Sequence, residues 1–155
     1  MKQILFVCTG NIFRSMIAEY ALRQAAGAPY DFASAGTEAK AQEMDGLVRR
    51  LLEERGIDPS GHRQRRLTPE IFSAADLVVA IGLDHAAYIE ENHGHKALLF
   101  NQIACGERRP ILDTWEAVPD YADNATERRA HIRRVVDHIC GAAPAFLRRL
   151  PPFLE

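Results

Sequence analysis

Short apolar segments alternate with segments of helical periodicity along the 155 residues of this chain, and that alternation limits the possible folds more than any other feature. The apolar segments have the length of buried strands and lie at residues 2–7, 30–35, 76–81 and 96–100. The helical patterns lie at residues 15–26, 45–55, 84–92 and 125–150. Strands that alternate with helices favour parallel pairing. The sequence therefore predicts an α/β fold with a doubly wound, four-stranded parallel sheet flanked by helices.

Composition and charge fit one compact domain over residues 1–155 and exclude several kinds of partner. Hydrophobic residues make up 47% of the chain, and neither a repeat nor a low-complexity linker interrupts it. A formal net charge of −2 provides no basic field for nucleic acid. No apolar run approaches the length of a membrane span, and the opening segment is too short for a secretory signal. We therefore expect a cytoplasmic protein that binds neither nucleic acid nor membranes.

The cysteines and histidines do not predict a disulfide or a metal site. Cys8, Cys105 and Cys140 are odd in number and lack the paired spacing of zinc ligands or of a disulfide framework. His93 and His95 lie close together, but no third ligand follows, and a solvated turn is the simpler interpretation. Neither a metal nor another cofactor is expected.

The segment CTGNIFRS, residues 8–15, joins the first predicted strand to the first predicted helix. In a doubly wound sheet, ligands bind at the carboxyl ends of strands, and a helix N-terminus there favours an anion. Gly10 and Asn11 tolerate backbone angles that other residues resist. Arg14 carries a planar guanidinium that can hold two oxygens of a tetrahedral anion. These residues together indicate a phosphate-binding loop.

Cys8 is the candidate nucleophile of this loop. The backbone field that attracts an anion also favours the thiolate form of a cysteine. Ser15 can donate a hydrogen bond to that thiolate, and it is also a candidate N-cap of the helix that follows. The simpler alternative is a buried cysteine at the end of a strand, because the spacing C-x5-R fixes only two positions. The strand before the loop and the Gly, Asn and Ser within it favour the phosphate loop.

Residues 7–15 resemble the signature V-C-x-G-N-x-C-R-S-P of the low-molecular-weight protein tyrosine phosphatases. The resemblance continues in the expected order through SAGT, RGIDPSGHRQRRLT, ADLVVAIGLDH and VPDY, at residues 34–37, 55–68, 75–85 and 118–121. It covers nearly the whole chain, and it implies hydrolysis of a phosphate monoester without a cofactor. The implied substrate is a protein that contains phosphotyrosine, or a small aryl phosphate.

Residue by residue, the resemblance implies a covalent mechanism. Cys8 matches the nucleophile that forms a phosphocysteine, and Arg14 matches the residue that holds the phosphoryl group. Asp120 matches the general acid, with Asp113 and Asp123 as nearby alternatives. The positions that match the hydrogen-bonding set of the loop are Asn11, Ser15, Ser34 and His62. The positions expected to bind phosphate or to line the mouth are Thr9, Gly10, Asn11, Ile12, Phe13 and Ser15.

The chain departs from the family pattern at several positions. Phe13 replaces the second cysteine of the loop, so the protective disulfide of many members cannot form. Met16 replaces a proline, and Tyr121 stands where a proline follows the acid. Residues 38–43 lack a frequent tryptophan, and Ile-Gly at 81–82 stands where Met with a polar partner is common. The departures at Phe13 and at residues 38–43 leave the residues for phosphate chemistry intact but argue against strict phosphotyrosine selectivity.

Two other functions are compatible with the same residues. One class of arsenate reductase shares the fold and the loop, but its thioredoxin-coupled members need two further cysteines, and residues 82–90 contain none. A reductase that uses a low-molecular-weight thiol therefore remains the main alternative. The second alternative is a non-catalytic phosphate-binding module, which would need no nucleophile.

Overall fold

A parallel sheet in the strand order β2-β1-β3-β4 forms the centre of this computed structural model, which describes residues 1–27 and 29–155. Its four strands are β1 (Lys2–Cys8), β2 (Tyr30–Gly36), β3 (Leu77–Ala80) and β4 (Leu98–Leu99). β1 is central and pairs with β2 along its whole length, so that Cys8 lies opposite Gly36. The chain moves to one side of β1 and then to the other, which makes the carboxyl end of β1 the switch point of the sheet.

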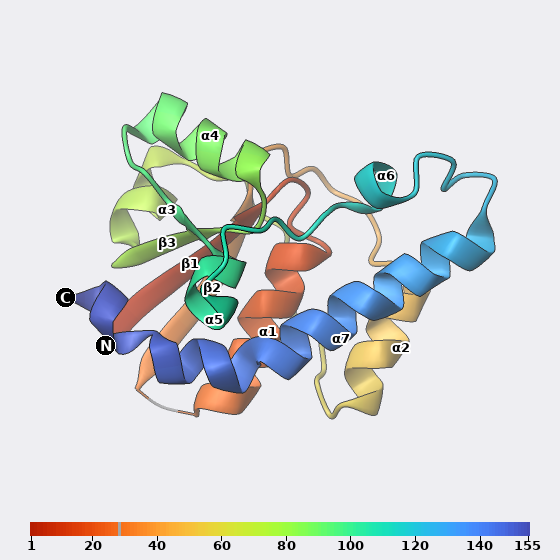
Figure 1. Cartoon of the computed structure of the whole chain (residues 1–155), viewed down its shortest axis with the longest axis horizontal. Helices are drawn as coiled ribbons and strands as arrows, with labels where there is room; N and C mark the ends of the chain where they lie inside the picture. Colours follow the sequence, from red (N-terminus) through yellow and green to blue (C-terminus); the bar gives the residue numbers. More distant parts are fainter. Residues whose placement is uncertain (28) are drawn as a thin grey trace.

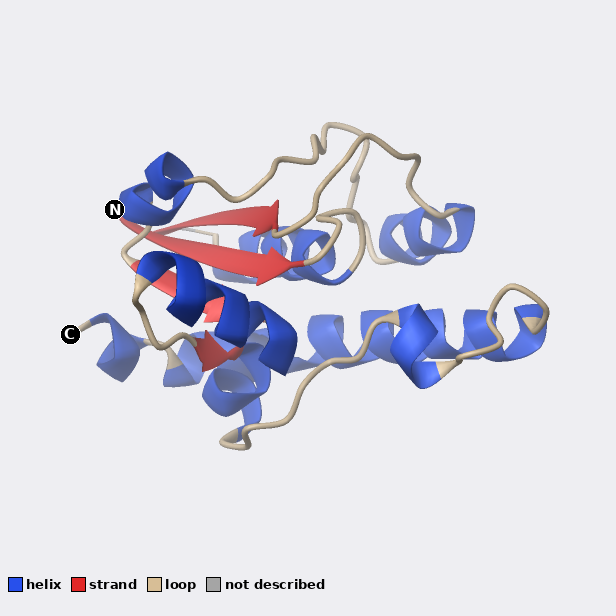
Figure 2. Cartoon of the chain, turned by 90° about the horizontal axis from the view of Figure 1, so that it is seen from above, coloured by secondary structure: helices blue, strands red, loops and turns tan. Residues whose placement is uncertain are grey.

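Helices cover both faces of the sheet. Alternate residues of β1 point to opposite faces, so Ile4 and Phe6 join one core cluster and Leu5 and Val7 the other. The first cluster is covered by α1 (Arg14–Ala26), α2 (Gly46–Glu54), α5 (Phe100–Cys105) and α7 (Ala125–Arg149). The second cluster is covered by α3 (Pro69–Ala74) and α4 (Leu83–His93). The predicted α/β class with a four-stranded parallel sheet is confirmed, and Figure 2 shows the strands side by side between helices.

The carboxyl end of β1 lies on the side of the sheet away from the two chain termini. Both termini lie at one end of the molecule, and the strands run from there towards the opposite end (Figures 1 and 2). The loop after β1 lies at the carboxyl edge of the sheet, and α6 (Thr114–Ala117) and the beginning of α7 lie beyond it on the side away from the termini (Figure 1). Residues far apart in the sequence therefore meet around Cys8. Among the described residues, no helix has the length and apolar character that crossing a membrane requires.

Several predicted boundaries were wrong. The strand expected at 96–100 is reduced to Leu98–Leu99, because α5 begins at Phe100. Ser15 is not an N-cap: α1 begins at Arg14, Phe13 occupies the cap position, and no side chain caps this end. By contrast, the C-terminal helix predicted at residues 125–150 is confirmed as Ala125–Arg149, with Pro144 inside it. The sequence did not predict the shorter helices α3, α5, α6 and η1 (Pro151–Leu154).

Candidate active site

A cavity of about 380 Å³ opens beside the loop that joins β1 to α1. Cys8, the last residue of β1, lies in its wall with only 2% of its surface exposed. Other parts of the wall come from the region before α2, from the segment that leads into α6, and from α7. The lining residues are Cys8, Gly10, Ile12, Phe13, Arg14, Gln42, Glu43, Asp45, Val48, Asp113, Thr114, Tyr121, Arg128 and Ile132.

Asn11 organises the interior of the loop. Its φ of 57° is the only positive value at a non-glycine residue in the described part of the chain, and its side chain is fully buried. The Asn11 amide donates to Ser15 Oγ at 3.0 Å and to Ser34 Oγ at 2.8 Å. Its Oδ1 accepts the backbone N–H of Arg65 at 3.0 Å. One side chain therefore connects the loop to α1, to β2 and to the segment before α3.

The Asn11 amide also leaves the hydrogen of the Ser15 hydroxyl available. Because the amide nitrogen of Asn11 only donates, Ser15 Oγ accepts that bond and can still donate its own hydrogen. Ser15 Oγ forms a 2.8 Å hydrogen bond with Cys8 Sγ, and the backbone N–H of Ser15 approaches the same sulfur at 3.4 Å. Two groups that can donate a hydrogen bond therefore face one sulfur.

Side chains from outside the loop form hydrogen bonds with its backbone carbonyl groups. The carbonyl oxygens of Asn11 and Gly10 accept bonds from His62 Nε2 at 2.6 Å and from Gln64 Nε2 at 2.7 Å. Both oxygens are thus occupied by residues outside the loop. Ser34 accepts from Asn11 and donates to Glu19 Oε1 at 2.5 Å, so Ser34 and His62 both contact Asn11, and their supporting role stays a prediction. Sequence inspection did not find Gln64 or Glu19.

Arg14 is almost completely buried, with 2% of its surface exposed, and its guanidinium is held by the segment before α6. One terminal nitrogen donates to the Ile111 carbonyl at 2.8 Å, and the other lies 3.2 Å from Asp113 Oδ2. Glu116 lies 3.9 Å from the guanidinium. Arg14 and Cys8 line the same cavity, so a bound oxyanion would lie within reach of the thiol and the guanidinium.

The structure brings Asp113, not Asp120, to this cavity. Asp113 is the N-cap of α6, where its Oδ1 accepts the Thr114 N–H at 2.8 Å. Asp120 is exposed, accepts a 3.2 Å hydrogen bond from Asn124, and is not among the lining residues, although its neighbour Tyr121 is. The sequence did contain a signal for Asp113, because Asp followed by Glu three residues later is typical of a capping box.

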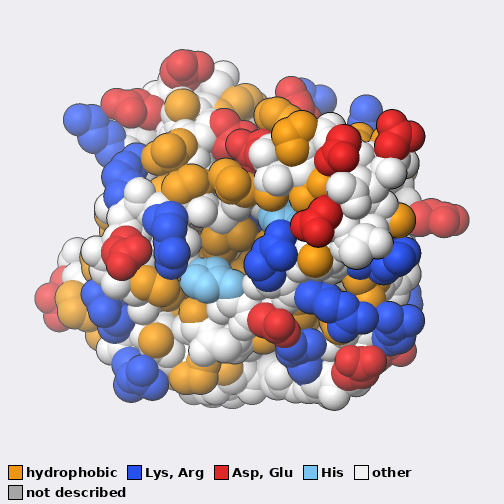
Figure 3. Space-filling view, turned by 45° about the vertical axis from the view of Figure 1, so that its right-hand side comes forward, with side chains coloured by type: hydrophobic (Ala, Val, Ile, Leu, Met, Phe, Trp, Pro, Cys, Tyr) orange, Lys and Arg blue, Asp and Glu red, His pale blue; other side chains and the backbone are white. Residues whose placement is uncertain are grey.

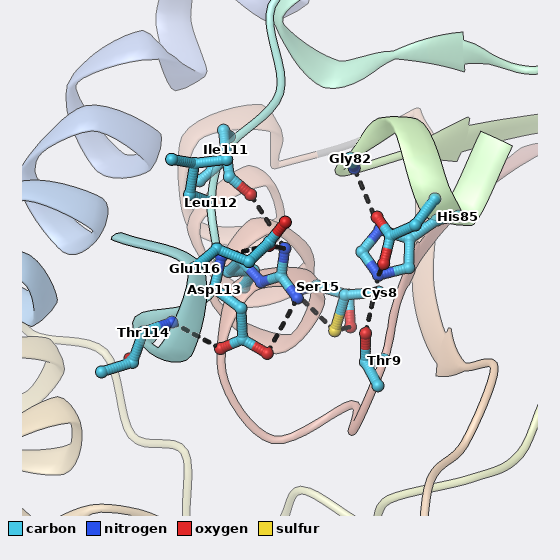
Figure 4. A network of polar contacts seen from close by, with 12 residues as sticks. Cys8, Thr9, Ser15, Gly82, His85, Ile111, Leu112, Asp113, Thr114 and Glu116 are labelled. Atoms are coloured by element: carbon cyan, nitrogen blue, oxygen red, sulfur yellow. Dashed lines mark hydrogen bonds and ion pairs between the residues drawn. The ribbon is translucent and has the colours of Figure 1, made fainter. Parts of the chain in front are cut away.

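A buried histidine that the sequence analysis did not single out contacts the loop through Thr9 (Figure 4). His85 Nδ1 accepts the Gly82 N–H at 3.0 Å, which leaves Nε2 to donate to Thr9 Oγ1 at 2.9 Å. Burial, together with the charge of Arg14, lowers the pKa of His85 to about 4, so this histidine is neutral at neutral pH. Thr9 is directed towards α4 and does not line the cavity, contrary to the expectation that it lines the mouth.

The fold and the site define a class: an α/β protein with an oxyanion loop between its first strand and helix. Residues 3–150 match the family model of low molecular weight phosphotyrosine protein phosphatases, and the chain belongs to that family.

Individual relatives differ in the activity that their names describe. The low molecular weight protein-tyrosine-phosphatase Ptp of Acinetobacter johnsonii is 36% identical over 92 residues, which are 58% of this chain and 63% of that protein. An arsenate reductase of Bacillus licheniformis is 35% identical over 85 residues, 55% of this chain and 60% of that protein. The chain therefore matches less than two thirds of either relative. The YwlE arginine phosphatase of Geobacillus stearothermophilus superposes with a TM-score of 0.82 at 25% identity, covering 99% of this chain and 95% of that one.

Proposed function

We propose that the protein hydrolyses phosphotyrosine or small aryl phosphates through a phosphocysteine intermediate. The observation that carries the proposal is the bond from the Ser15 hydroxyl to Cys8 Sγ, in a cavity that also contains Arg14. A donor directed at the sulfur prepares a nucleophile, which a protein that only binds phosphate would not need. The lining residues Ile12, Phe13 and Tyr121 provide apolar surface for an aromatic ring.

In the first step, the Cys8 thiolate attacks phosphorus, so that an S–P bond forms and the bond to the leaving oxygen breaks. The Arg14 guanidinium holds two of the phosphoryl oxygens and stabilises the charge that develops on them. The leaving phenolate takes a proton from a carboxyl group at the cavity, and we assign this role to Asp113, which lines the cavity. Asp113 Oδ2 lies 3.2 Å from a terminal nitrogen of Arg14, which supports the assignment because the guanidinium would hold the phosphoryl group.

In the second step, a water molecule attacks phosphorus and the S–P bond breaks. The Asp113 carboxylate accepts a proton from that water, and the Cys8 thiolate leaves with the bonding electron pair. Inorganic phosphate is released, and both groups return to their starting protonation states. Asp113 thus serves as acid and then as base.

Hydrolysis of p-nitrophenyl phosphate tests the nucleophile. We expect the Cys8→Ser variant to lose turnover while it still binds phosphate, whereas Cys105→Ser and Cys140→Ser, which change thiols outside the cavity, keep the wild-type rate. Substantial hydrolysis by Cys8→Ser would refute the covalent route. Phosphotyrosine, phosphoserine and phosphoarginine peptides, and arsenate with a set of thiols, test the substrate class. Reduction of arsenate without hydrolysis of any phosphate would replace the proposal with the reductase.

A series of aryl phosphates tests the acid. We expect Asp113→Asn to slow the hydrolysis of poor leaving groups by about 10²- to 10⁴-fold and that of good leaving groups much less. The matched variant Asp120→Asn removes an equally charged carboxylate from outside the cavity and should follow the wild-type dependence. The opposite pattern would return the role of the acid to Asp120.

A further inference from the structure

A second cavity of about 350 Å³ lies beside the segment that holds Arg14, and the proposed reaction does not use it. It is lined by the beginning of α5, the segment before α6, and the middle of α7. The lining residues are Asn101, Arg109, Pro110, Ile111, Leu112, Ala117, His131, Arg134, Val135 and His138. Figure 3 shows a hollow near the middle of its face, with Lys, Arg and His side chains beside apolar ones.

The ionisable side chains that line this cavity are all basic. They are Arg109, Arg134, His131 and His138, and no carboxylate is among the lining residues. Arg109 has a carboxylate of Glu107 at 3.6 Å, and Arg134 forms no salt bridge with any residue that the structure describes. Burial lowers the pKa of His138, and the charge of Arg109 lowers it further. The local field therefore opposes further positive charge, although the whole chain carries a net charge of −2.

The remaining wall of the cavity is apolar. Pro110, Ile111, Leu112 and Val135 contribute hydrocarbon surface, and Leu112 is 39% exposed, a large fraction for a leucine. An apolar wall with a few charged groups at its edge is the usual composition of a site for a small organic ligand. Basic groups at such an edge select an acidic ligand.

We propose that this cavity binds a small organic anion, with the apolar body of the anion against Ile111 and Leu112 and its acidic group at Arg109 and Arg134. The occupant is a molecule with a ring-sized hydrocarbon body and one carboxylate or sulfonate.

The cavity is connected to the active site through two carbonyl oxygens of its wall. The Ile111 carbonyl accepts from Arg14 at 2.8 Å, and the next carbonyl, that of Leu112, accepts from His131 Nε2 at 3.1 Å. Asp113 follows directly. An anion bound against this segment contacts the residues that position the guanidinium and the acid, so it changes the rate of the chemical step. This part of the inference rests on the proposed function.

Fluorescence titration of the whole chain with 8-anilinonaphthalene-1-sulfonate tests the binding site, because this probe joins aromatic rings to a sulfonate. We expect saturable binding of one probe per chain. The double variant Arg109→Gln with Arg134→Gln should bind at least about 10-fold more weakly, since it loses the charge-assisted contacts. The matched control, Arg108→Gln with Arg133→Gln, removes the same charge from neighbouring residues outside the cavity and should stay within about 2-fold of the wild type.

Three results would refute the proposed binding site: no saturable binding of the probe, equal weakening in both double variants, or unchanged binding in the Arg109 and Arg134 double variant.

Kinetics with p-nitrophenyl phosphate test the connection between this cavity and the active site. We expect the probe to change kcat with KM nearly constant, and this effect should be absent in the Arg109 and Arg134 double variant. A purely competitive effect would place the probe in the Cys8 cavity and refute the connection. If the protein hydrolyses no phosphate ester, the fluorescence comparison still decides the binding site.

Discussion

Replacement of Asn11 by alanine should remove a large part of the stability of this protein. The variant loses three hydrogen bonds, to Ser15, Ser34 and the Arg65 N–H, at 3.0, 2.8 and 3.0 Å. Each is worth about 1 kcal/mol net. Alanine must also adopt a φ of 57°, which costs roughly 1 kcal/mol more. We therefore expect the free energy of unfolding to fall by about 4 kcal/mol, a large share of a typical total of about 5–15 kcal/mol.

Glycine at position 11 separates the cost of the lost hydrogen bonds from the cost of the positive φ. Because glycine adopts positive φ without strain, Asn11→Gly should unfold at a higher urea concentration than Asn11→Ala when both are followed by circular dichroism. Asn101 is the matched control, since it is a second buried asparagine with side-chain bonds to the Arg109 carbonyl and to His138, but it lies inside α5. There the order should reverse, because glycine within a helix costs about 1 kcal/mol relative to alanine.

A loss below about 1.5 kcal/mol for Asn11→Ala would contradict the central role of this side chain. The reasoning on its backbone angle would fail if alanine were at least as stable as glycine at position 11.

Two other contacts make separate predictions. Gly36→Ala should destabilise the protein by about 2 kcal/mol or more in urea unfolding, because the added Cβ would lie 2.4 Å from the Thr9 carbonyl oxygen. Gly46→Ala, whose Cβ would meet nothing within 4 Å, should change stability by less than about 1 kcal/mol; similar effects for both would refute the steric argument. His85 has a folded pKa of about 4, below its unfolded value of about 6.5. The unfolded chain therefore binds more protons between these values, and stability is lost as the pH falls through them, by an amount on the order of 2 kcal/mol by pH 4.5. Unfolding at pH 7, 6 and 5 should show a weaker pH dependence for His85→Gln, and an unchanged dependence would exclude His85 as the cause.

The first strand, the loop and the first helix were predictable because their signal is local. Eight consecutive residues contain the thiol, the glycine, the asparagine and the guanidinium, and the apolar run before them leaves little choice of secondary structure. The alternation of strands and helices was sufficient for the parallel sheet, which the structure confirms. The role of Ser15 as a helix cap was wrong because its hydroxyl bonds to Cys8 and Asn11 instead.

The distant parts of the site were less predictable because they depend on the path of loops. Asp113 and Asp120 lie in one irregular segment, and only the position of that segment beside Arg14 distinguishes them. His85 reaches Thr9 because β3 pairs with β1, with Leu77 opposite Ile4, so that the segment after β3 lies next to the loop. The pattern of residue types along the chain predicts neither the position of that segment beside Arg14 nor the contact of His85 with Thr9.

The contacts that shape the loop also relate it to the folding of the whole chain. Asn11 meets Arg65 across 54 residues, and Arg14 meets Ile111 across 97. Contacts between residues so far apart in the chain form slowly compared with a helix. During refolding, helical circular dichroism should therefore return before the ability to bind phosphate. A chain released from the ribosome before residue 111 would lack the carbonyl that holds its arginine, so the reactive loop cannot be completed until this distant segment has been synthesised.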